Sequence, residues 1–285
     1  MKKTLFYLKK YLWDSLIGNI IIVFLFINYG WQSFIIPSAS MEKTLMTGDL
    51  LFANKHAFGL LKPVIPILEI PLTPKSNNNY LLEFKKPTRG EIIIFHPPFD
   101  NKTFFVKRIV AKTGDLVFFK NKHLFISFSE IPDIKNIDKC ETIKIGNKVF
   151  YKEPYKNAYS SIVNDQNIPT INTFVSRPKN MANLSPDLKQ NLENNHVLFN
   201  ISNFPTKNDL SNYSIEGQDM LLIKGDEYFM IGDNRDHSSD SRFWGTINFK
   251  HIAGTPSIVF FSFDWDKKEI RWDRIGKMQF EVNRI

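Results

Sequence analysis

The sequence has only one cysteine, no internal repeats and, after residue 41, no long apolar run. Cys140 therefore cannot form an intramolecular disulfide, and its charged neighbours in "DKCETIK" predict a half-buried structural residue rather than a catalytic thiol. The six histidines stand alone along the chain, without the spacing of metal ligands. These absences exclude a disulfide framework, a repeat architecture and further membrane spans after the first one.

The composition is that of a folded protein. Of the 285 residues, 43% are apolar and 14% are aromatic, which is enough to build one large core or two modest ones. The net charge of +8 favours acidic partners such as anionic lipid head groups or nucleic acid. The basic residues are scattered, however, and no basic helix or aromatic-basic ladder is visible, so nucleic-acid binding is not predicted.

The amino terminus combines basic residues with a charge-free apolar stretch. Lysines occupy positions 2, 3, 9 and 10, and no charged residue follows from Ser15 through Met41. The densest apolar part, 16–27, extends weakly to residue 36 and so reaches the roughly 20 residues that a bilayer-spanning helix needs. Because lysines before a span predict a cytoplasmic amino terminus, we expect a basic cytoplasmic tail at 1–14 and a transmembrane anchor at 15–33.

A cleavable signal peptide is the competing interpretation of this segment. A basic region, an apolar core and the small residues of "PSAS" come in the order that such peptides show. The bulky segment "WQSFIIP" delays any small-residue cleavage site, which favours an uncleaved anchor.

The rest of the chain is typical of a mainly β protein. Segments rich in β-branched and aromatic residues, bounded by glycines and other turn residues, lie at 91–95, 103–111, 115–119, 123–128, 147–151, 196–201, 219–224, 227–232 and 256–265. Residues 152–218 differ, because they are rich in Asn, Ser and Pro and contain one short helix signal at 185–194. We interpret 152–218 as part of an insertion that decorates the β core.

Two serines, Ser38 and Ser40, follow the apolar stretch in "IIPSASMEKTL". A serine hydroxyl needs a base to act as a nucleophile, and bases that serve include histidine, an amino terminus and a neutral lysine. Lys107 in "TFFVKRIVA" is a candidate, because on a strand it shares a face with Phe105 and Ile109, and burial lowers the pKa of an amine. The strand pattern by itself favours the alternative, in which the stem covers apolar surface and the ammonium stays in water.

A loop at 230–245, "MIGDNRDHSSDSRFWG", concentrates charge after an apolar strand. Its aspartates, Asp233, Asp236 and Asp240, miss the alternating spacing of a calcium loop, and Arg235 and Arg242 would repel a cation. The composition favours Asp–Arg ion pairs that fix the loop beside a site.

Together, and in this order, these segments resemble the type I signal peptidases, membrane-anchored Ser/Lys endopeptidases that remove signal sequences from exported preproteins. Beyond the anchor, the resemblance rests on "PSASMEKTLMTGDLLFANKHAFG" (37–59), "RGEIIIFHPP" (89–98), "FFVKRIVAKTGD" (104–115), "GDNRDHSSDSRFWG" (232–245) and "IRWDRIG" (270–276). The lexA-type self-cleaving repressors share the Ser/Lys chemistry but lack the anchor and the "GDNRDHSSDSR" loop. The resemblance reverses the interpretation of Lys107 in favour of a buried base.

The resemblance implies a role for each matching residue. Ser40 is similar to the nucleophile, Lys107 to the general base, Ser38 to the residue that donates to the oxyanion, and Ser238 to the serine that orients the lysine amine. The residues similar to those that line the substrate pockets are Ile36, Pro37, Met41, Leu45, Phe105 and Val106. The charged residues similar to those that hold the site in place are Arg108, Asp233, Asp240 and Arg242.

The resemblance also implies the fold and the domain organisation. We expect a mainly β, signal-peptidase/lexA-like fold of coiled antiparallel sheets with an N-terminal transmembrane helix. The catalytic β domain would comprise 34–116 and 227–285, and an inserted variable domain would comprise 117–226.

The activity implied is the cleavage of signal peptides of the Ala-x-Ala type, with small residues one and three positions before the cut. No metal or cofactor is implied, and the partners are preproteins and the lipid bilayer, not nucleic acid. We expect a monomer near the secretion machinery, with one span in the bacterial inner (cytoplasmic) membrane and the catalytic domain on its outer, periplasmic face.

Two positions depart from the family pattern. The family usually has Pro where this chain has Lys43, and often Tyr where it has Phe105, so we expect a looser turn after the nucleophile and an altered pocket wall. Neither departure affects a group that transfers a proton in the reaction, so activity is still expected. A catalytically silent, anchored β protein that binds exported chains or scaffolds a secretion complex remains the alternative function.

Overall fold

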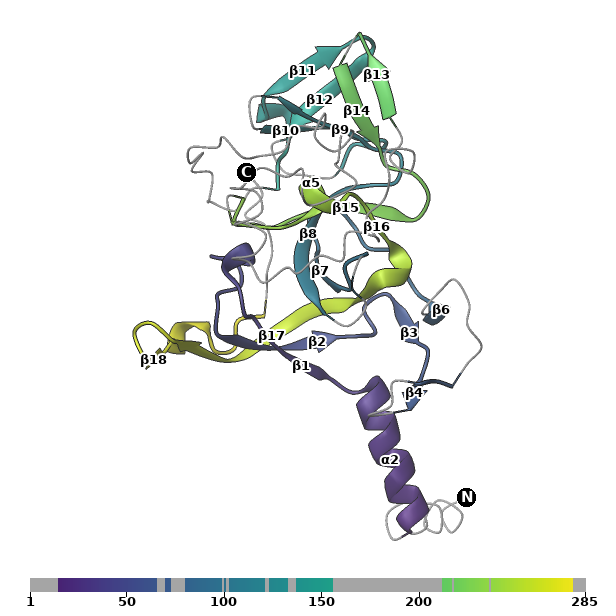
Figure 1. Ribbon diagram of the computed structural model, residues 1–285, viewed down its shortest axis with the longest axis vertical. Helices are drawn as coiled ribbons and strands as arrows, with labels where there is room; N and C mark the ends of the chain where they lie inside the picture. The colour runs from purple at the N-terminus through teal and green to yellow at the C-terminus, as the bar shows by residue number, and fades with distance from the viewer. Residues whose placement is uncertain are drawn as a thin grey trace, which may run out of the picture.

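The structure is a computed structural model that describes residues 15–65, 70–72, 80–98, 100, 103–120, 123–132, 137–155, 212–216, 218–235 and 237–278. The prediction of a mainly β protein is confirmed, because short antiparallel strands dominate these residues (Figure 1). The strand expected at 196–201 and the helix expected at 185–194 lie outside the described residues.

The main sheet is antiparallel and contains the elements that form the site. Its strand order is β1-β2-β17-β7-β8-β15-β16, with β18 paired to β17. The bounds are β1 Gln32–Ile35, β2 Asp49–Asn54, β7 Ile92–Phe95, β8 Phe105–Lys112, β15 Glu227–Ile231, β16 Ile247–Asn248, β17 Ile252–Asp264 and β18 Glu269–Ile270. Register shifts interrupt the pairing of β17 with both β2 and β7, and such bulges bend and twist a strand.

A second sheet lies at the opposite end of the molecule from the N-terminal helix (Figure 1). Its order is β11-β12-β10-β9-β14-β13, with bounds β9 Leu116–Lys120, β10 His123–Ser127, β11 Thr142–Ile145, β12 Lys148–Lys152, β13 Asn212–Ile215 and β14 Gln218–Leu222. All six strands fall within 116–222, close to the insertion expected at 117–226, whose status as a separate domain stays a prediction. The remaining strands pair as β3 Gly59–Leu61 with β6 Tyr80–Glu83, and β4 Val64–Ile65 with β5 Ile70–Pro71.

The short helical elements are the α-helices α2 Leu16–Tyr29 and α5 Ser241–Trp244 and the 3₁₀ turns η1 Ala39–Met41, η2 Ile137–Lys139, η6 Phe249–His251 and η7 Trp272–Arg274. The side chain of Asp240 caps α5 by accepting from the backbone N–H of Arg242. This cap marks where α5 begins within the charged loop at 230–245.

Strand β8 contributes to separate cores through the alternation of its side chains. Phe105 and Ile109 pack in a cluster with Phe95, Met230 and other residues of the main sheet. Val110 packs in another cluster, together with side chains of β9 and β10 from the second sheet. The alternation expected for "TFFVKRIVA" is therefore confirmed, and it places Lys107 on the face of Phe105 and Ile109.

The N-terminal helix α2 projects from the β core next to β3 and β4 (Figure 1). His56 Nε2 lies 2.6 Å from the carbonyl oxygen of Tyr29, the last residue of α2, and the two rings stack at 5.9 Å. Within the described part of the chain, no helix has both the length and the apolar character to cross a bilayer. The transmembrane anchor at 15–33 therefore stays a prediction.

Candidate active site

The predicted nucleophile and base meet, although 67 positions separate them in sequence. Ser40 lies on η1, between β1 and β2, and Lys107 lies on β8, where it is opposite Ile93 of β7. Lys107 Nζ donates to Ser40 Oγ at 2.7 Å and to the carbonyl oxygen of Val106 at 3.0 Å. This is the distance at which a base can take a proton from a hydroxyl.

The side chain of Lys107 is removed from water. The residue is 4% exposed, and its Nζ lies 5.5 Å from the centre of the Phe105 ring. Burial is the largest influence, and it lowers the pKa of Lys107 from 10.5 to about 8; Arg242 acts in the same direction, while Asp240 and Asp233 oppose it. A substantial fraction of this amine is therefore neutral in mildly alkaline solution.

Ser38 lies on the solvent side of Ser40. Its hydroxyl donates to Ser40 Oγ at 3.4 Å, and the residue is exposed. A hydroxyl in this place can turn toward an oxygen that forms on a carbonyl attacked by Ser40. The oxyanion role that the resemblance implies for Ser38 stays a prediction.

A buried ion pair fixes the start of the charged loop to β8. Arg108 Nε and Nη2 donate to the two carboxylate oxygens of Asp233 at 2.8 and 2.6 Å, and Arg108 Nη1 donates to the carbonyl oxygen of Gly90 at 2.7 Å. Thr44 Oγ1 also donates to Asp233, at 2.5 Å. Arg108 is the residue next to Lys107, so this pair holds the base strand and the loop in register.

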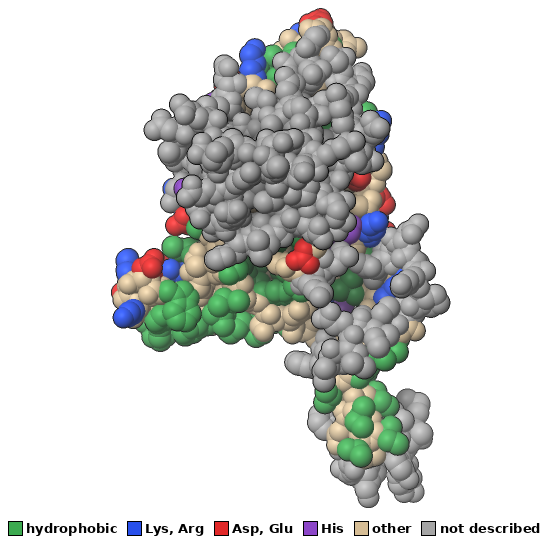
Figure 2. Space-filling model, in the orientation of Figure 1, with side chains coloured by type: hydrophobic (Ala, Val, Ile, Leu, Met, Phe, Trp, Pro, Cys, Tyr) green, Lys and Arg blue, Asp and Glu red, His purple; other side chains and the backbone are tan. Residues whose placement is uncertain are grey.

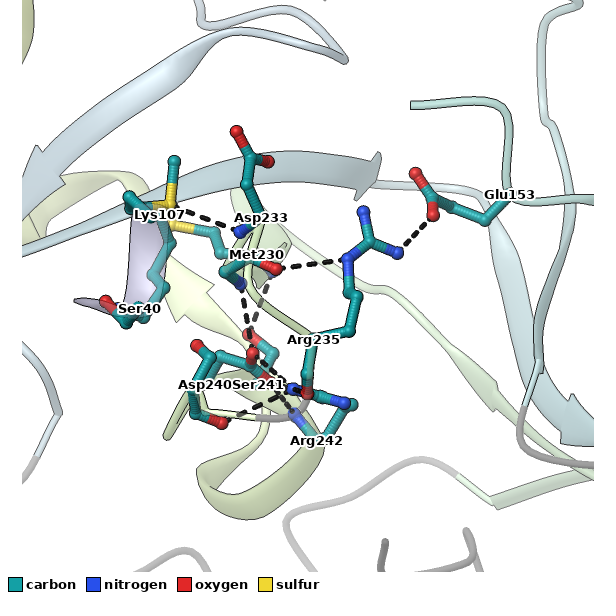
Figure 3. A network of polar contacts seen from close by, with 12 residues as sticks. Ser40, Lys107, Glu153, Met230, Asp233, Arg235, Asp240, Ser241 and Arg242 are labelled. Atoms are coloured by element: carbon teal, nitrogen blue, oxygen red, sulfur yellow. Dashed lines mark hydrogen bonds and ion pairs between the residues drawn. The ribbon is translucent and has the colours of Figure 1, made fainter. Parts of the chain in front are cut away.

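A second buried pair closes the loop on itself. Arg242 Nε and Nη2 donate to Asp240 at 2.8 and 2.9 Å, and the backbone N–H of Gly232 donates to the same carboxylate at 3.0 Å (Figure 3). Burial alone would raise the pKa of Asp240, but the charge of Arg242 and the hydrogen bonds lower it below its ordinary value. Asp240 therefore remains a carboxylate beside Lys107.

The loop also holds the nucleophile through Asn234. Its backbone N–H donates to the carbonyl oxygen of Ser40 at 3.1 Å, and its side-chain amide donates to Ala39 O at 3.1 Å and to Glu42 Oε2 at 3.2 Å. The sequence analysis did not single out Asn234, although it lies inside the quoted loop. These bonds fix η1 on both sides of the serine.

Ser238 is buried beside Gly232, close to the backbone of Ser40, but it has no hydrogen bond to Lys107. Its hydroxyl instead contributes to the hydrogen bonding that lowers the pKa of Asp240. Gly232 makes the close approach possible, since a Cβ there would overlap Ser238 and lie 2.5 Å from Ser40 O. The lysine-orienting role of Ser238 stays a prediction, and in this conformation Lys107 is oriented by Ser40 and Val106.

The six residues expected to line substrate pockets differ in exposure. Pro37 is exposed, Phe105 and Val106 are half-buried, and Ile36, Met41 and Leu45 lie in one apolar core cluster with exposed fractions of 5%, 1% and 0%. In this conformation Ile36, Met41 and Leu45 belong to the apolar core, and Pro37, Phe105 and Val106 reach the surface. Their role in substrate binding stays a prediction.

The turn after the nucleophile differs from one that contains proline. Lys43 has φ 72°, in the left-handed region, whereas the proline ring fixes φ near about −65°. Leu45 N donates to Met41 O at 2.7 Å across this turn. The departure at Lys43 thus corresponds to a different backbone path, which proline could not follow.

Two further ion pairs near the site escaped the sequence analysis. Arg274 donates to Asp49 at 2.6 Å and to the carbonyl oxygen of Thr44 at 3.0 Å, so the carboxyl-terminal segment holds the turn after Ser40. Arg235 pairs with Glu153, which follows β12. Arg274 and Asp49 lie in quoted segments, but only the fold brings them together, and nothing in the sequence distinguishes Glu153.

No group of three or more His, Cys, Asp or Glu residues that could hold a metal ion occurs in the described part of the chain. The carboxylates of Asp233 and Asp240 are each engaged by an arginine. The calcium-loop interpretation therefore gains no support from these two residues. Cys140 is half-buried, as expected, and burial raises the pKa of its thiol.

Comparison with known families gives a match over most of the chain. The family described as "Signal peptidase, peptidase S26" matches residues 9–261. The chain belongs to this signal peptidase family. One relative, "Signal peptidase I" of Helicobacter pylori (strain ATCC 700392 / 26695), is 36% identical over 295 residues, which cover 95% of this chain and 93% of the relative.

Other signal peptidases show lower similarity. "Signal peptidase I" of Haemophilus influenzae is 29% identical and covers 90% of this chain and 70% of the relative. A solved structure of a signal peptidase I from Enterococcus faecalis V583 has 19% sequence identity and a TM-score of 0.28, and the match covers 60% of this chain and 97% of that chain.

Proposed function

We propose that this signal peptidase family member is a membrane-anchored serine endopeptidase that cleaves N-terminal signal peptides from exported preproteins. Its cut follows small residues at positions −1 and −3, and Ser40 and Lys107 form the catalytic dyad. The observation that carries the proposal is the 2.7 Å contact between Ser40 Oγ and the amine of the 4% exposed Lys107.

In acylation, Lys107 first accepts a proton from Ser40 and then donates it to the leaving group. The neutral amine of Lys107 takes the proton of Ser40 Oγ while the oxygen attacks the scissile carbonyl, which gives a tetrahedral oxyanion and a lysine ammonium. The ammonium then protonates the nitrogen of the leaving chain as the carbon–nitrogen bond breaks. The products of this step are the mature protein, with a free amine, and an acyl ester on Ser40.

Deacylation repeats the sequence with water. Lys107 takes a proton from a water molecule, the hydroxide attacks the ester, and the protonated lysine returns the proton to Ser40 Oγ. The hydroxyl of Ser38 and the backbone N–H of Ser40 stabilise the oxyanion in both steps. Lys107 thus carries each proton that the reaction moves, from Ser40 to the leaving amine in acylation and from water to Ser40 in deacylation.

Membrane attachment is supported by apolar surface on two parts of the molecule. Figure 2 shows hydrophobic side chains along α2 and along the edge formed by the β1, β2, β17 and β18 strands. The exposed large side chains of this edge and of the following segment are Trp31, Ile35, Trp265, Trp272, Ile275 and Met278. Tryptophan is enriched at membrane interfaces, so this surface fits a lipid partner beside the anchor.

Incubation of the purified protein with an Ala-x-Ala peptide, followed by mass mapping of the products, tests the proposed activity. We expect one cut directly after the second alanine, and we expect Ser40→Ala to reduce the rate by a factor on the order of 10⁴ or more, because the nucleophile is lost. A Ser33→Ala variant, which changes an exposed serine on β1, serves as the control and should cut normally. Equal rates for Ser40→Ala and the unchanged protein would exclude a Ser40 peptidase.

Replacing Ser38 with alanine tests the oxyanion role. The loss of one oxyanion donor should lower kcat about 100- to 1000-fold, while KM for the same peptide changes little because the donor acts mainly in the transition state. Steady-state kinetics on the peptide measure both values. A kcat within a factor of about two of the unchanged protein would remove Ser38 from the oxyanion site.

A further inference from the structure

An ion pair joins the second sheet to the loop that holds the nucleophile. Glu153 follows β12, and its backbone N–H donates to the carbonyl oxygen of Leu124 on β10 at 2.9 Å, so its backbone is fixed by the second sheet. Its carboxylate pairs with Arg235 of the charged loop at 230–245, which we call the catalytic loop below (Figure 3). The dyad chemistry described above uses neither residue.

The carboxylate of the pair is buried and the guanidinium is half-buried, which makes the pair unlike a surface salt bridge. The side chain of Glu153 is 2% exposed and that of Arg235 is 18% exposed. A buried ion pair rarely adds net stability over apolar side chains of the same size, whereas removal of one partner is costly. Positioning is therefore the better account of why two charges occupy this place.

Arg235 is hydrogen-bonded to other residues of the loop, so its position affects theirs. Its Nε donates to the carbonyl oxygen of Gly232 at 3.0 Å, and its own carbonyl oxygen accepts from Arg242 Nη2 at 2.6 Å. The preceding residue, Asn234, donates its backbone N–H to Ser40 O at 3.1 Å. A displacement of Arg235 thus shifts the residue that holds the carbonyl of the nucleophile.

We propose that Glu153 is a positioning residue for the catalytic loop, acting through Arg235 and Asn234 on Ser40. The inference rests on the proposed peptidase function and assigns the second sheet a role in positioning the nucleophile. The dyad needs Ser40 Oγ within hydrogen-bond distance of Lys107 Nζ, and misplacement of reacting groups by about 1 Å can cost on the order of 100-fold in rate. The second sheet, which carries Glu153 at the end of β12, therefore contributes to kcat.

The test compares Glu153→Ala and Glu153→Gln with Glu141→Gln in peptide cleavage by the full chain. Glu141 directly precedes β11 of the same sheet and pairs with Lys152 at 2.7 Å, but its side chain is 58% exposed, so it is a matched control. We expect Glu153→Ala to lower kcat about 10-fold with KM within about two-fold, Glu153→Gln to recover most of this loss, and Glu141→Gln to have no effect. Arg235→Ala combined with Glu153→Ala should be no slower than Arg235→Ala alone, because the two residues act as one unit.

Hydrogen exchange gives a readout that does not need activity. We expect the Asn234 amide to exchange about 10-fold faster in Glu153→Ala than in the unchanged protein or Glu141→Gln, because the loop is released locally. Unchanged kcat and unchanged exchange in Glu153→Ala, in a protein whose cleavage depends on Ser40, would overturn the positioning role alone. If the unchanged protein cuts no peptide, the proposed function fails, and the exchange comparison still decides whether Glu153 positions the loop. If Glu153→Ala does not fold, Glu153→Met, which fills a similar space without a hydrogen-bond acceptor for Arg235, takes its place in both measurements.

Discussion

Replacing Lys107 with methionine is expected to abolish cleavage and to stabilise the fold. The rate should fall by a factor on the order of 10⁴, because no other base is in contact with Ser40 Oγ among the described residues. Methionine has nearly the same length and no charge, so it fills the space without the cost of burying an ammonium. Peptide cleavage measures the first effect, and denaturant unfolding measures the second.

The size of the stability gain follows from the pKa of Lys107. The folded-state value of about 8 lies below the ordinary value of 10.5, so the unfolded chain binds the proton more tightly. At neutral pH the buried charge therefore costs about 3 kcal/mol, which Lys107→Met removes. The free energy of unfolding of the unchanged protein should rise as the pH increases from about 8 toward 10.5, and the variant should lose that part of the slope.

Lys112 provides the matched control for this substitution. It lies on the same strand as Lys107, but its side chain is 33% exposed and its partner Glu130 is 79% exposed. Lys112→Met should leave both the cleavage rate and the free energy of unfolding nearly unchanged. If Lys107→Met cuts the peptide as fast as Lys112→Met does, Lys107 is not the base.

Replacing Asp233 with asparagine is expected to destabilise the protein strongly. The change leaves the guanidinium of Arg108, which has no exposed surface, without an opposite charge. Breaking a buried pair in this way costs about 3–5 kcal/mol. The loss should appear as a lower urea midpoint, together with reduced cleavage, because Asp233 also fixes the loop and Thr44 to the base strand.

Asp226 offers the comparison for Asp233. It pairs with Lys86 at 3.1 Å, but the two side chains are 62% and 41% exposed. Asp226→Asn should therefore cost less than about 1 kcal/mol. Equal losses from the two variants would show that the Arg108–Asp233 pair contributes no more than a surface contact.

The strand that carries the base was predictable from its own residues. The alternation in "TFFVKRIVA" gives a strand and places Lys107 between Phe105 and Ile109, as the structure shows. Local pattern could not say whether the amine was buried, because that depends on η1, the partner strands and the charged loop. The family resemblance supplied that step, and the contact with Ser40 agrees with it.

Contacts between distant charges were not predictable in the same way. Arg274 and Asp49 are 225 positions apart, and Arg235 and Glu153 are 82 positions apart. Any of many acidic residues could have been the partner, since only the strand order brings a particular pair together. Short strands such as β3 and β6 were missed for a related reason, because three or four residues carry too little periodicity to be distinguished from loop.

The dependence of kcat/KM on pH tests most directly whether a neutral Lys107 activates Ser40. For the unchanged protein acting on an Ala-x-Ala peptide, we expect kcat/KM to rise with pH and to level off above a single midpoint near about 8, because the lysine acts as base only after it loses its proton. A profile that is flat between about pH 5 and about pH 10, or a midpoint near the ordinary lysine value of 10.5, would contradict a buried, neutral base at residue 107.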